Sequence, residues 1–353
     1  MSSSIPAVIL GASGYVGGEL LRLIAAHPQF ELAAAVSDSR AGSAIGDAFA
    51  HLSRALRDHS FVAHDDWLQK IESGGDLALF SAAPHGASAA VIANALEACD
   101  RNSINVRIVD SSADFRYERQ SDYEAVYETS HGAPQLLDQF VCAIPEHAGP
   151  VHSLHVGHPG CFATATLLAA VPLIRSGLTD AEVYVSGITG STGSGKNPQA
   201  GTHHPERNSN LYAYKPLAHR HAPEMAALTE AATGRATKVH FVPHSGPFAR
   251  GIHVTLQAKA KSAVNETELR ALFAAAYKDS AFVDVIATTP RLKNVVASNL
   301  CQLSVATDGE SVVVMSVIDN LVKGAAGGAM QWMNRLWGLP EICGLTAASP
   351  GWT

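Results

Sequence analysis

Apolar and polar residues alternate along this chain in two different ways, which predict different folds for its two halves. In the first half, short apolar runs are followed by stretches with apolar residues at helical spacing. The predicted strands and helices of this half are residues 6–10, 31–36, 76–82 and 106–109, and residues 18–26 and 87–99, respectively. Strands that alternate with helices are typical of βαβ units, so we expect a Rossmann-type α/β domain with a parallel sheet.

The pattern changes after residue 161, where an apolar helix over 163–174 is predicted. Strands and a closing helix follow, and the Asp-Gly at 308–309 indicates a hairpin turn. The predicted elements are strands at 181–188, 237–242, 252–258, 300–306 and 311–317, and a helix at 321–337. We expect an α+β domain with a mixed or antiparallel sheet. The domain boundaries that we predict are 1–157 with 320–353 for dinucleotide binding, and 158–319 for catalysis, substrate binding and oligomerisation.

Composition and charge narrow the function classes. The 353 residues carry a formal net charge of -7 with scattered Lys and Arg, which argues against a nucleic-acid or anionic membrane partner. The start of the chain has no pattern of a signal peptide, and no apolar run approaches the roughly 20 residues of a membrane span. The five cysteines are irregularly spaced without a CxxC pair, which indicates free thiols in a reducing cytosol. We therefore expect a cytoplasmic protein.

A glycine-rich turn joins the first predicted strand to the first predicted helix. It reads Gly-Ala-Ser-Gly-Tyr-Val-Gly over residues 11–17, with GxxGxxG spacing instead of the more common GxGxxG. Glycines let the backbone turn tightly and let a pyrophosphate approach, and the helix N-terminus supplies N–H groups. We predict a dinucleotide-binding turn, with a purely structural turn as the alternative. The candidate cofactor-binding residues here are Gly11, Ser13, Gly14, Tyr15, Val16 and Gly17.

The end of the second predicted strand bears on which dinucleotide is bound. An acidic residue such as Asp38 would hold the ribose 2′-hydroxyl of NAD. Serine hydroxyls and an arginine would instead hold the 2′-phosphate of NADP, and the chain offers both types of group. The hydroxyls and the guanidinium outweigh the carboxylate if Asp38 points away, so we predict NADP. The predicted ligands of the 2′-phosphate are Ser37, Ser39 and Arg40.

Cys161 follows a Pro-Gly pair at the start of the predicted apolar helix. Backbone N–H groups and the helix dipole favour a thiolate at such a place and lower the thiol pKa below the value of about 8.5 for free cysteine. We therefore predict a nucleophile. A buried structural thiol is the alternative interpretation, and it is the one that we favour for Cys99, Cys142, Cys301 and Cys343.

A nucleophilic cysteine needs a base, and the chain has 17 histidines. His219 and His221 stand out because Pro223 suits the first turn of a helix, so both imidazoles and Arg220 gather at the start of that helix. A solvated loop with a helix cap is the alternative. No HExxH motif is present, and two adjacent histidines at 203–204 cannot share a helix face, so no metal site is predicted.

Six segments, in this order, give the chain a resemblance to a known family. They are residues 11–17, Ala-Pro-His-Gly-Ala-Ser at 83–88, Asp-Ser-Ser-Ala-Asp-Phe-Arg at 110–116, Pro-Gly-Cys at 159–161, His-Arg-His-Ala-Pro-Glu at 219–224 and Asp-Asn-Leu-Val-Lys-Gly-Ala-Ala-Gly at 319–327. Over nearly its whole length the chain resembles the N-acetyl-gamma-glutamyl-phosphate reductases of arginine biosynthesis, within the aspartate-semialdehyde dehydrogenase superfamily. The resemblance implies NADPH-dependent reduction of N-acetyl-γ-glutamyl phosphate to N-acetylglutamate 5-semialdehyde and phosphate, through a cysteine thioester.

The resemblance also implies roles for single residues. Cys161 is the nucleophile and His221 the acid/base, with substrate-binding His219 and Arg220 nearby. Arg116 matches a phosphate-binding arginine of the superfamily. The remaining implied positions are Pro84 and His85 over the cofactor, and Asn320 and Lys323 in a segment that returns to the nicotinamide. Arg250 fits a phosphate or carboxylate by its paired donors, and a surface charge is an equal alternative. A homo-oligomer, dimer or tetramer, is expected.

The chain departs from the family pattern at several positions. His158 replaces the usual Asn before Pro-Gly-Cys and competes as a partner of the thiol, and Ala163 replaces a Pro. Cys142-Ala143 stands for a Tyr-Gly, and residues 196–214 have few family landmarks. The open alternatives are the aminoadipyl-phosphate reductase of lysine biosynthesis, aspartate-semialdehyde dehydrogenase and, remotely, a non-catalytic dinucleotide-sensing regulator.

Overall fold

The computed structural model describes residues 4–150 and 152–352, and the polypeptide divides into two compact units. The first unit comprises Met1–Ala143, Pro150–His158 and Ala325–Thr346, and the second comprises Ile144–Gly149, Pro159–Gly324 and Ala347–Thr353. Relative to the predicted domain boundaries, residues 144–149, residues 320–324 and the segment from Ala347 onward belong to the second unit instead of the first, and His158 belongs to the first instead of the second. Which domain carries which function stays a prediction.

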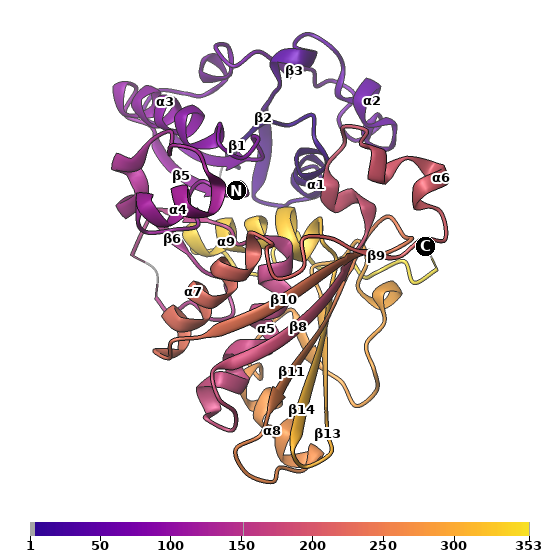
Figure 1. Ribbon diagram of the computed structural model, residues 1–353. Coiled ribbons are helices and arrows are strands. Elements are labelled where there is room, and N and C mark those ends of the chain that lie inside the picture. The colour runs from indigo at the N-terminus through magenta and orange to yellow at the C-terminus, as the bar shows by residue number, and fades with distance from the viewer. Residues whose placement is uncertain (1–3, 151, 353) are drawn as a thin grey trace. The chain divides into compact units, whose positions relative to one another are not determined.

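The first unit is built on a seven-stranded parallel sheet in the order β3-β2-β1-β4-β5-β7-β6 (Figure 1). Its strands are β1 Ile5–Leu10, β2 Phe30–Val36, β3 Phe61–Val62, β4 Asp76–Ser81, β5 Asn105–Asp110, β6 Phe140–Cys142 and β7 His155–Gly157. Its helices are α1 Tyr15–Ile24, α2 Ile45–Ala48, α3 Ser88–Arg101, α4 Gln120–Tyr127 and α9 Gly327–Leu336. The Rossmann-type prediction is confirmed.

Helices cover both faces of this parallel sheet, which explains why its strands are apolar runs without alternation. Val8 and Leu79 pack with Ile92 of α3 in one core cluster. Helices α1 and α9 contact each other, and α9 packs on β5. Successive strand residues point to opposite faces of the sheet, and helices cover both faces, so both sets of side chains are buried. The loops that follow β1, β4 and β5 begin at the carboxyl ends of these strands, where ligands bind in such folds.

The second unit holds a seven-stranded mixed sheet in the order β12-β13-β14-β11-β8-β10-β9, which confirms the predicted mixed sheet. Its strands are β8 Glu182–Thr189, β9 Tyr212–Ala213, β10 Lys238–Ser245, β11 Ile252–Lys259, β12 Val283–Val285, β13 Cys301–Thr307 and β14 Ser311–Ile318. Its helices are α5 Cys161–Ser176, α6 His204–Arg207, α7 His221–Thr233 and α8 Glu266–Ala276. One face packs on helices, with α5 against β11 and β14, α7 against β10 and α8 against β13 (Figure 1).

Helix α5 is the centre of the second core, and its residues from Phe162 to Ile174 are all buried. Pro172 interrupts its hydrogen bonds because proline has no N–H to donate to the carbonyl of Leu168 four residues earlier. The hydroxyl of Tyr277, just after α8, donates to that carbonyl at 2.6 Å. Tyr277 thus supplies the donor that the helix lacks at this carbonyl. The Tyr277 oxygen also lies 2.9 Å from Nε2 of His147.

The closing helix differs from the prediction. Residues 321–337 are predicted as one helix, but the structure has a π-helical turn at Val322–Ala326 and α-helix only from Gly327. The short strands β3, β6, β7, β9 and β12 are also absent from the sequence-based expectations. Within the described residues, no helix is long and apolar enough to cross a membrane.

Candidate active site

The glycine-rich turn of the first unit has the geometry that close backbone approach requires. Gly11 has φ +73°, and a Cβ there would lie 2.7 Å from the backbone of Ala82. A Cβ on Gly17 would lie 2.5 Å from the carbonyl oxygen of Ala12. At Gly14, by contrast, the nearest atom would be 4.0 Å away, so this glycine borders open space. Helix α1 begins at Tyr15 without a side-chain cap or an acidic residue in its first turn, which suits an anionic ligand.

Asp38, the acidic residue that follows β2, is hydrogen-bonded to the protein's own backbone. The Asp38 carboxylate accepts a hydrogen bond from the backbone N–H of His64 at 2.7 Å. The Ser37 hydroxyl donates to Ser13 Oγ at 2.9 Å and lies 3.4 Å from Ser39 Oγ. A row of hydroxyls therefore runs from the glycine-rich turn to the strand tip.

Two of the family segments come together at the carboxyl ends of β4 and β5. Asp114 is fully buried, and its carboxylate accepts from the N–H groups of Gly86 at 2.8 Å and Ala89 at 3.0 Å. His85 Nδ1 accepts from the N–H of Ala113 at 2.9 Å. The loop that contains Pro84 and His85 is thus fixed by the loop after β5.

Arg116 and His158 lie in the same unit, at the point where the chain leaves it. Arg116 is 6% exposed, and its guanidinium donates to the carbonyl oxygens of His158 at 3.1 Å and Ser111 at 3.2 Å. The His158 N–H in turn donates to the Asp110 carbonyl at 2.7 Å. Burial raises the pKa of Asp110, against the hydrogen bonds from Ser112 and Ser88 that favour its ionised form.

Cys161 is the first residue of α5 and is partly buried. Gly160 precedes it as the N-cap with no side-chain cap, and its N–H donates to Glu224 Oε1 at 2.7 Å. Glu224 is fully buried on α7, so this bond joins the starts of the two helices. A Cβ on Gly324 would lie 2.7 Å from the Cβ of Cys161, so backbone packs directly against the thiol-bearing carbon.

The histidine segment meets the start of α5 through Phe162. The centroid of the Phe162 ring lies 6.0 Å from that of His219 and 6.2 Å from that of His221, and the two imidazoles are 4.7 Å apart. His219 Nδ1 accepts from the N–H of His221 at 3.2 Å. Burial, followed by the charges of Arg220 and Lys215, lowers the pKa of His219 to about 4. His219 is therefore neutral near pH 7, whereas His221, 8% exposed, begins α7 beside it.

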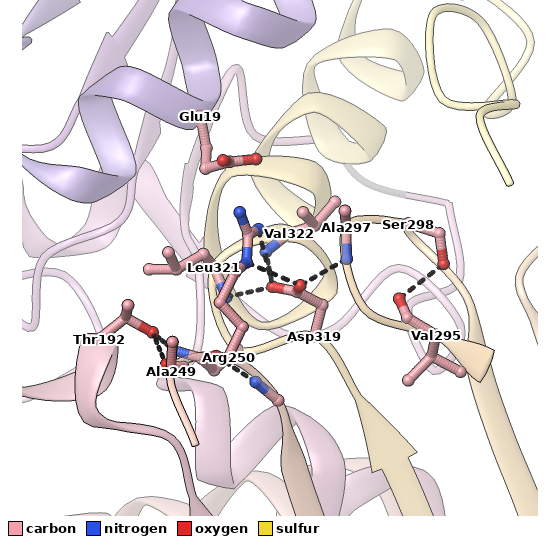
Figure 2. A network of polar contacts seen from close by, with 12 residues as sticks. Glu19, Thr192, Ala249, Arg250, Val295, Ala297, Ser298, Asp319, Leu321 and Val322 are labelled. Carbon is pink, nitrogen blue, oxygen red and sulfur yellow. Dashed lines mark hydrogen bonds and ion pairs between the residues drawn. The ribbon is translucent and has the colours of Figure 1, made fainter. Parts of the chain in front are cut away.

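Arg250 has an internal anionic partner (Figure 2). Its Nε and Nη2 donate to the two oxygens of Asp319, at 3.0 and 3.2 Å. The same buried carboxylate accepts from the N–H groups of Ala297 at 2.6 Å, Leu321 at 2.8 Å and Val322 at 2.9 Å. The Arg250 guanidinium, which the sequence predicts to bind substrate, is thus held by Asp319, and Asp319 also fixes the turn that follows β14.

Asn320 and Lys323 are also engaged inside the second unit. Asn320 accepts from the N–H of Gly251 at 2.7 Å and donates to the Thr192 hydroxyl at 3.0 Å. The fully buried Lys323 forms an ion pair with Glu146. Lys323 belongs to the π-helical turn Val322–Ala326 and directly precedes Gly324.

The sequence gives no warning of two residues beside these groups. Tyr214 lies 5.6 Å from His219 between ring centroids, and burial, then the nearby Cys161 side chain, raise the pKa of its phenol. Arg207 is buried and donates to Ser245 Oγ and to the carbonyl oxygens of Gly246 and Phe248. Both belong to residues 196–214, where the sequence shows few family landmarks and gives no sign of burial or of ring contacts. Among the residues that the structure describes, no cluster of three or more His, Cys, Asp or Glu could hold a metal ion.

Comparisons with known proteins agree with the resemblance in the sequence. The family models described as "Semialdehyde dehydrogenase, NAD binding domain" and "Semialdehyde dehydrogenase, dimerisation domain" match residues 6–149 and 161–320. An N-acetyl-gamma-glutamyl-phosphate reductase of Pseudomonas aeruginosa is 38% identical over 97% of this chain and 98% of its own length. That of Methanosarcina barkeri is 37% identical over 97% of this chain and 98% of its own. The chain belongs to the N-acetyl-gamma-glutamyl-phosphate reductase family.

Membership in this family confirms the predicted class, an NAD(P)-dependent oxidoreductase. Solved structures confirm the fold. Aspartate semialdehyde dehydrogenase II of Vibrio cholerae superposes with a TM-score of 0.70 at 14% identity, covering 96% of this chain and 99% of that chain. Aspartate semialdehyde dehydrogenase with NADP from Candida albicans gives 0.64 at 16% identity, covering 95% and 99%. The dimerisation domain in the family model also indicates a homo-oligomer.

Proposed function

We propose that this protein reduces N-acetyl-γ-glutamyl phosphate to N-acetylglutamate 5-semialdehyde and phosphate, with Cys161 as the nucleophile and His221 as the acid/base. The observation that carries the proposal is the joint start of α5 and α7. The Gly160–Glu224 hydrogen bond and the ring contacts of Phe162 with His219 and His221 link the two helix starts, on either side of Cys161 in the sequence, and this supports the assignment. Family membership supports the same activity.

The reaction divides into two steps at Cys161. His221 takes the proton from Sγ, and the thiolate attacks the acyl carbon. The bond from that carbon to the phosphate oxygen breaks, His221 gives its proton to the departing phosphate, and a thioester remains. A bound nicotinamide supplies the hydride that reduces the thioester carbon. The C–S bond then breaks, the aldehyde leaves, and the thiolate is ready again. Backbone N–H groups at the start of α5 favour the thiolate in both steps.

His221 is a better proton carrier than His219. A residue that exchanges protons near neutrality works best with a pKa near the operating pH. The low pKa of His219, about 4, keeps its imidazole neutral, and its Nδ1 already accepts the N–H of His221. His219 is therefore proposed to hold the segment and contact the substrate. His221 is preferred to His158 because His221 has a ring contact with Phe162, the residue that follows Cys161.

The proposed substrate carries an α-carboxylate and a neutral N-acetyl group. Arg220 is exposed beside His221 and would bind the carboxylate, whereas Arg250 is held by Asp319. Arg116 is proposed to bind the phosphate. An unacylated α-amino group would need a carboxylate partner, and burying it unpaired costs about 3 to 5 kcal/mol.

Phosphate-dependent oxidation of three aldehydes tests the substrate. N-acetylglutamate semialdehyde, its aminoadipyl analogue and aspartate semialdehyde would be compared with the same enzyme and NADP. We expect kcat/KM for aspartate semialdehyde to be lower by roughly a hundredfold or more, since about 3 kcal/mol corresponds to that factor. Comparable rates for aspartate semialdehyde, or a preference for the aminoadipyl aldehyde, would exclude this substrate and retain acyl-phosphate reduction.

The proposed cofactor is NADP, bound by Gly11, Ser13, Gly14, Tyr15, Val16 and Gly17 and, at its 2′-phosphate, by Ser37, Ser39 and Arg40. The contact of Asp38 with His64 N–H supports this choice, because the carboxylate is committed to the backbone. Arg40→Ala should raise KM for NADPH roughly tenfold to a hundredfold and leave KM for NADH unchanged, as expected for one charged hydrogen bond. Arg57→Ala, which removes an exposed arginine of the same unit, is the control. Equal use of NADPH and NADH by the unmodified enzyme would contradict the choice.

We further propose a dimer or tetramer in the cytoplasm. A groove of about 490 Å³ lies on the face of the second sheet away from α5. It is lined by Tyr184 of β8, 55% exposed, and by Leu217 of the segment before α7, 66% exposed. Light scattering of the unmodified protein and of Tyr184→Glu measures the mass directly. A monomer at micromolar concentration in the unmodified protein would exclude this assembly.

A further inference from the structure

Gly324 of the π-helical turn packs against the residue that we propose as the nucleophile. A Cβ at this position would lie 2.7 Å from the Cβ of Cys161 and 3.1 Å from its Cα, so a larger residue does not fit without displacing Cys161. The Gly324 N–H donates to the carbonyl oxygen of Asp319, five residues earlier, at 2.9 Å. This hydrogen bond follows the π-helical pattern, and π-helical turns are frequent at functional sites.

Lys323, the residue before Gly324, is fully buried and forms an ion pair with Glu146, whose side chain is only 2% exposed. The Lys323 Nζ also lies 5.5 Å from the centroid of the Phe282 ring. Lysine is almost never fully buried without a partner, and a buried ion pair often stabilises a fold no better than two apolar side chains of similar volume. The pair therefore needs an explanation other than stability, and fixing one arrangement of the chain is such a role.

Glu146 belongs to a segment that is itself anchored in the second unit. Ile144 lies in the core cluster of this unit, and Nε2 of His147 lies 2.9 Å from the Tyr277 hydroxyl. That hydroxyl donates to a carbonyl of α5 at 2.6 Å. Residues 144–149 thus hold the carboxylate against the core around α5, and the ion pair connects the π-helical turn to this anchor.

We propose that Lys323, Glu146 and Gly324 are positioning residues for the Cys161 thiol. The ion pair fixes the π-helical turn, and Gly324 in that turn limits where Cys161 and the first turn of α5 can lie. The thiol is thereby kept beside the backbone N–H groups at the start of α5 and aligned for attack on the acyl carbon. This proposal rests on the proposed role of Cys161, and it assigns none of the three residues a contact with substrate.

Gly324→Ala tests the contact directly, because the added methyl group overlaps the Cβ of Cys161 and both charges of the ion pair stay in place. We expect kcat to fall roughly a hundredfold, the effect of a displacement of about 1 Å at a reacting group, and KM for the aldehyde to change by less than about threefold. Gly149→Ala in the same unit is the matched control, because a Cβ there would meet no other described residue within 4 Å. This control should keep kcat within about twofold.

Lys323→Met and the double variant Glu146→Gln/Lys323→Met remove the ion pair. Both should lower kcat roughly tenfold or more and shift the pH profile of iodoacetamide labelling at Cys161 to higher pH, since the thiol leaves the N–H groups of α5. Lys261→Met, which breaks the exposed pair with Asp180, is the matched control and should leave the profile unchanged. A role in stability alone would lower the melting temperature and change neither kcat per folded molecule nor the labelling profile.

Cys301 reports whether a variant is folded, because it is fully buried on β13 and should stay unlabelled as long as the second unit is intact. If Lys323→Met is labelled at Cys301, the double variant decides, and if that variant is also labelled there, Gly324→Ala decides. An unchanged kcat and labelling profile in a folded pair variant overturns the proposal, and so does an unchanged kcat in Gly324→Ala. Normal turnover of Cys161→Ser, by contrast, would overturn the proposed function itself.

Discussion

Cys161 and Cys301 belong to the same unit and contact the same hydrophobic core, but they differ in burial and in the backbone element that carries them. Cys301 is fully buried on β13, with Sγ 3.6 Å from Ser316 Oγ. Burial raises its pKa to about 12, although the Ser316 hydroxyl and Lys323 act in the opposite direction. Cys161 begins a helix, is partly exposed, and has backbone N–H groups in place of strand neighbours. The comparison shows that two cysteines of one unit can differ in exposure and in backbone surroundings, and these two factors control the pKa of a thiol.

The sharpest way to break this comparison is to remove the thiol of Cys161. Cys161→Ser should lower kcat by roughly three orders of magnitude or more, because a serine hydroxyl is a far weaker nucleophile at neutral pH. NADPH binding, measured by fluorescence titration, should stay within twofold. Turnover near that of the unmodified enzyme would show that Cys161 is not the nucleophile.

The two neighbouring histidines sharpen the comparison on the side of Cys161. His221→Asn should lower kcat roughly a hundredfold and abolish the acidic limb of the pH–rate profile. His219→Asn should keep that limb, since a group with a pKa of about 4 does not titrate there, and should mainly raise KM. A retained profile in His221→Asn together with its loss in His158→Asn would transfer the proton to His158.

The titratable groups near Cys301 are buried, so we expect the protonation of His147 to change the free energy of unfolding and not the rate of catalysis. Burial lowers the pKa of His147 to about 4, with Arg175 and Lys323 acting in the same direction and Glu146 against it. Between pH 6.5 and 4 the unfolded chain binds a proton that the folded protein does not, so stability falls as pH falls through this window and is fully present above it. His147 should therefore lower the free energy of unfolding by about 2 kcal/mol between pH 7 and pH 5.

His147→Gln keeps a side chain able to meet the Tyr277 hydroxyl and removes the titration. Urea unfolding of both proteins at pH 7 and pH 5 measures the difference. The variant should lose about 2 kcal/mol less than the unmodified protein over this interval. An identical pH dependence in both proteins would show that His147 titrates normally.

The smallest effect is expected at Cys301 itself. Cys301→Ala should lower the free energy of unfolding by about 1 to 2 kcal/mol, the size of a small buried deletion, and leave kcat within twofold. Iodoacetamide should label Cys161 in the folded protein and spare Cys301, as mass spectrometry of peptides would show. A large loss of activity in Cys301→Ala would make the two thiols equivalent and end the comparison.

The sequence was sufficient for the fold class because its signals are local. Strand runs, the glycine-rich turn and the Asp-Gly hairpin each lie within a few residues. Strands β9 and β12 were missed since two or three residues give no periodicity, and the π-helical turn at Val322–Ala326 follows the same apolar spacing as an ordinary helix. Such elements are set by neighbours distant in the chain.

The candidate site shows the same limit. The sequence placed Arg250 among anion ligands, and its bond to Asp319 joins residues 69 positions apart. The low pKa of His219 likewise depends on burial that no motif records. Residue types can suggest which groups perform chemistry, but which of them already have partners is decided by tertiary contacts.

The proline in helix α5 has a consequence for how the protein is made. The Leu168 carbonyl that Pro172 leaves without a helical donor is served by Tyr277, 109 residues later. At roughly 5 to 20 residues per second, a ribosome needs about 5 to 20 s to synthesise the chain between these two residues. During that interval the Leu168 carbonyl cannot have the partner that it has in the folded protein. The Leu168 carbonyl can be hydrogen-bonded inside the core only after Tyr277 has been synthesised. The second unit therefore completes its core late in translation.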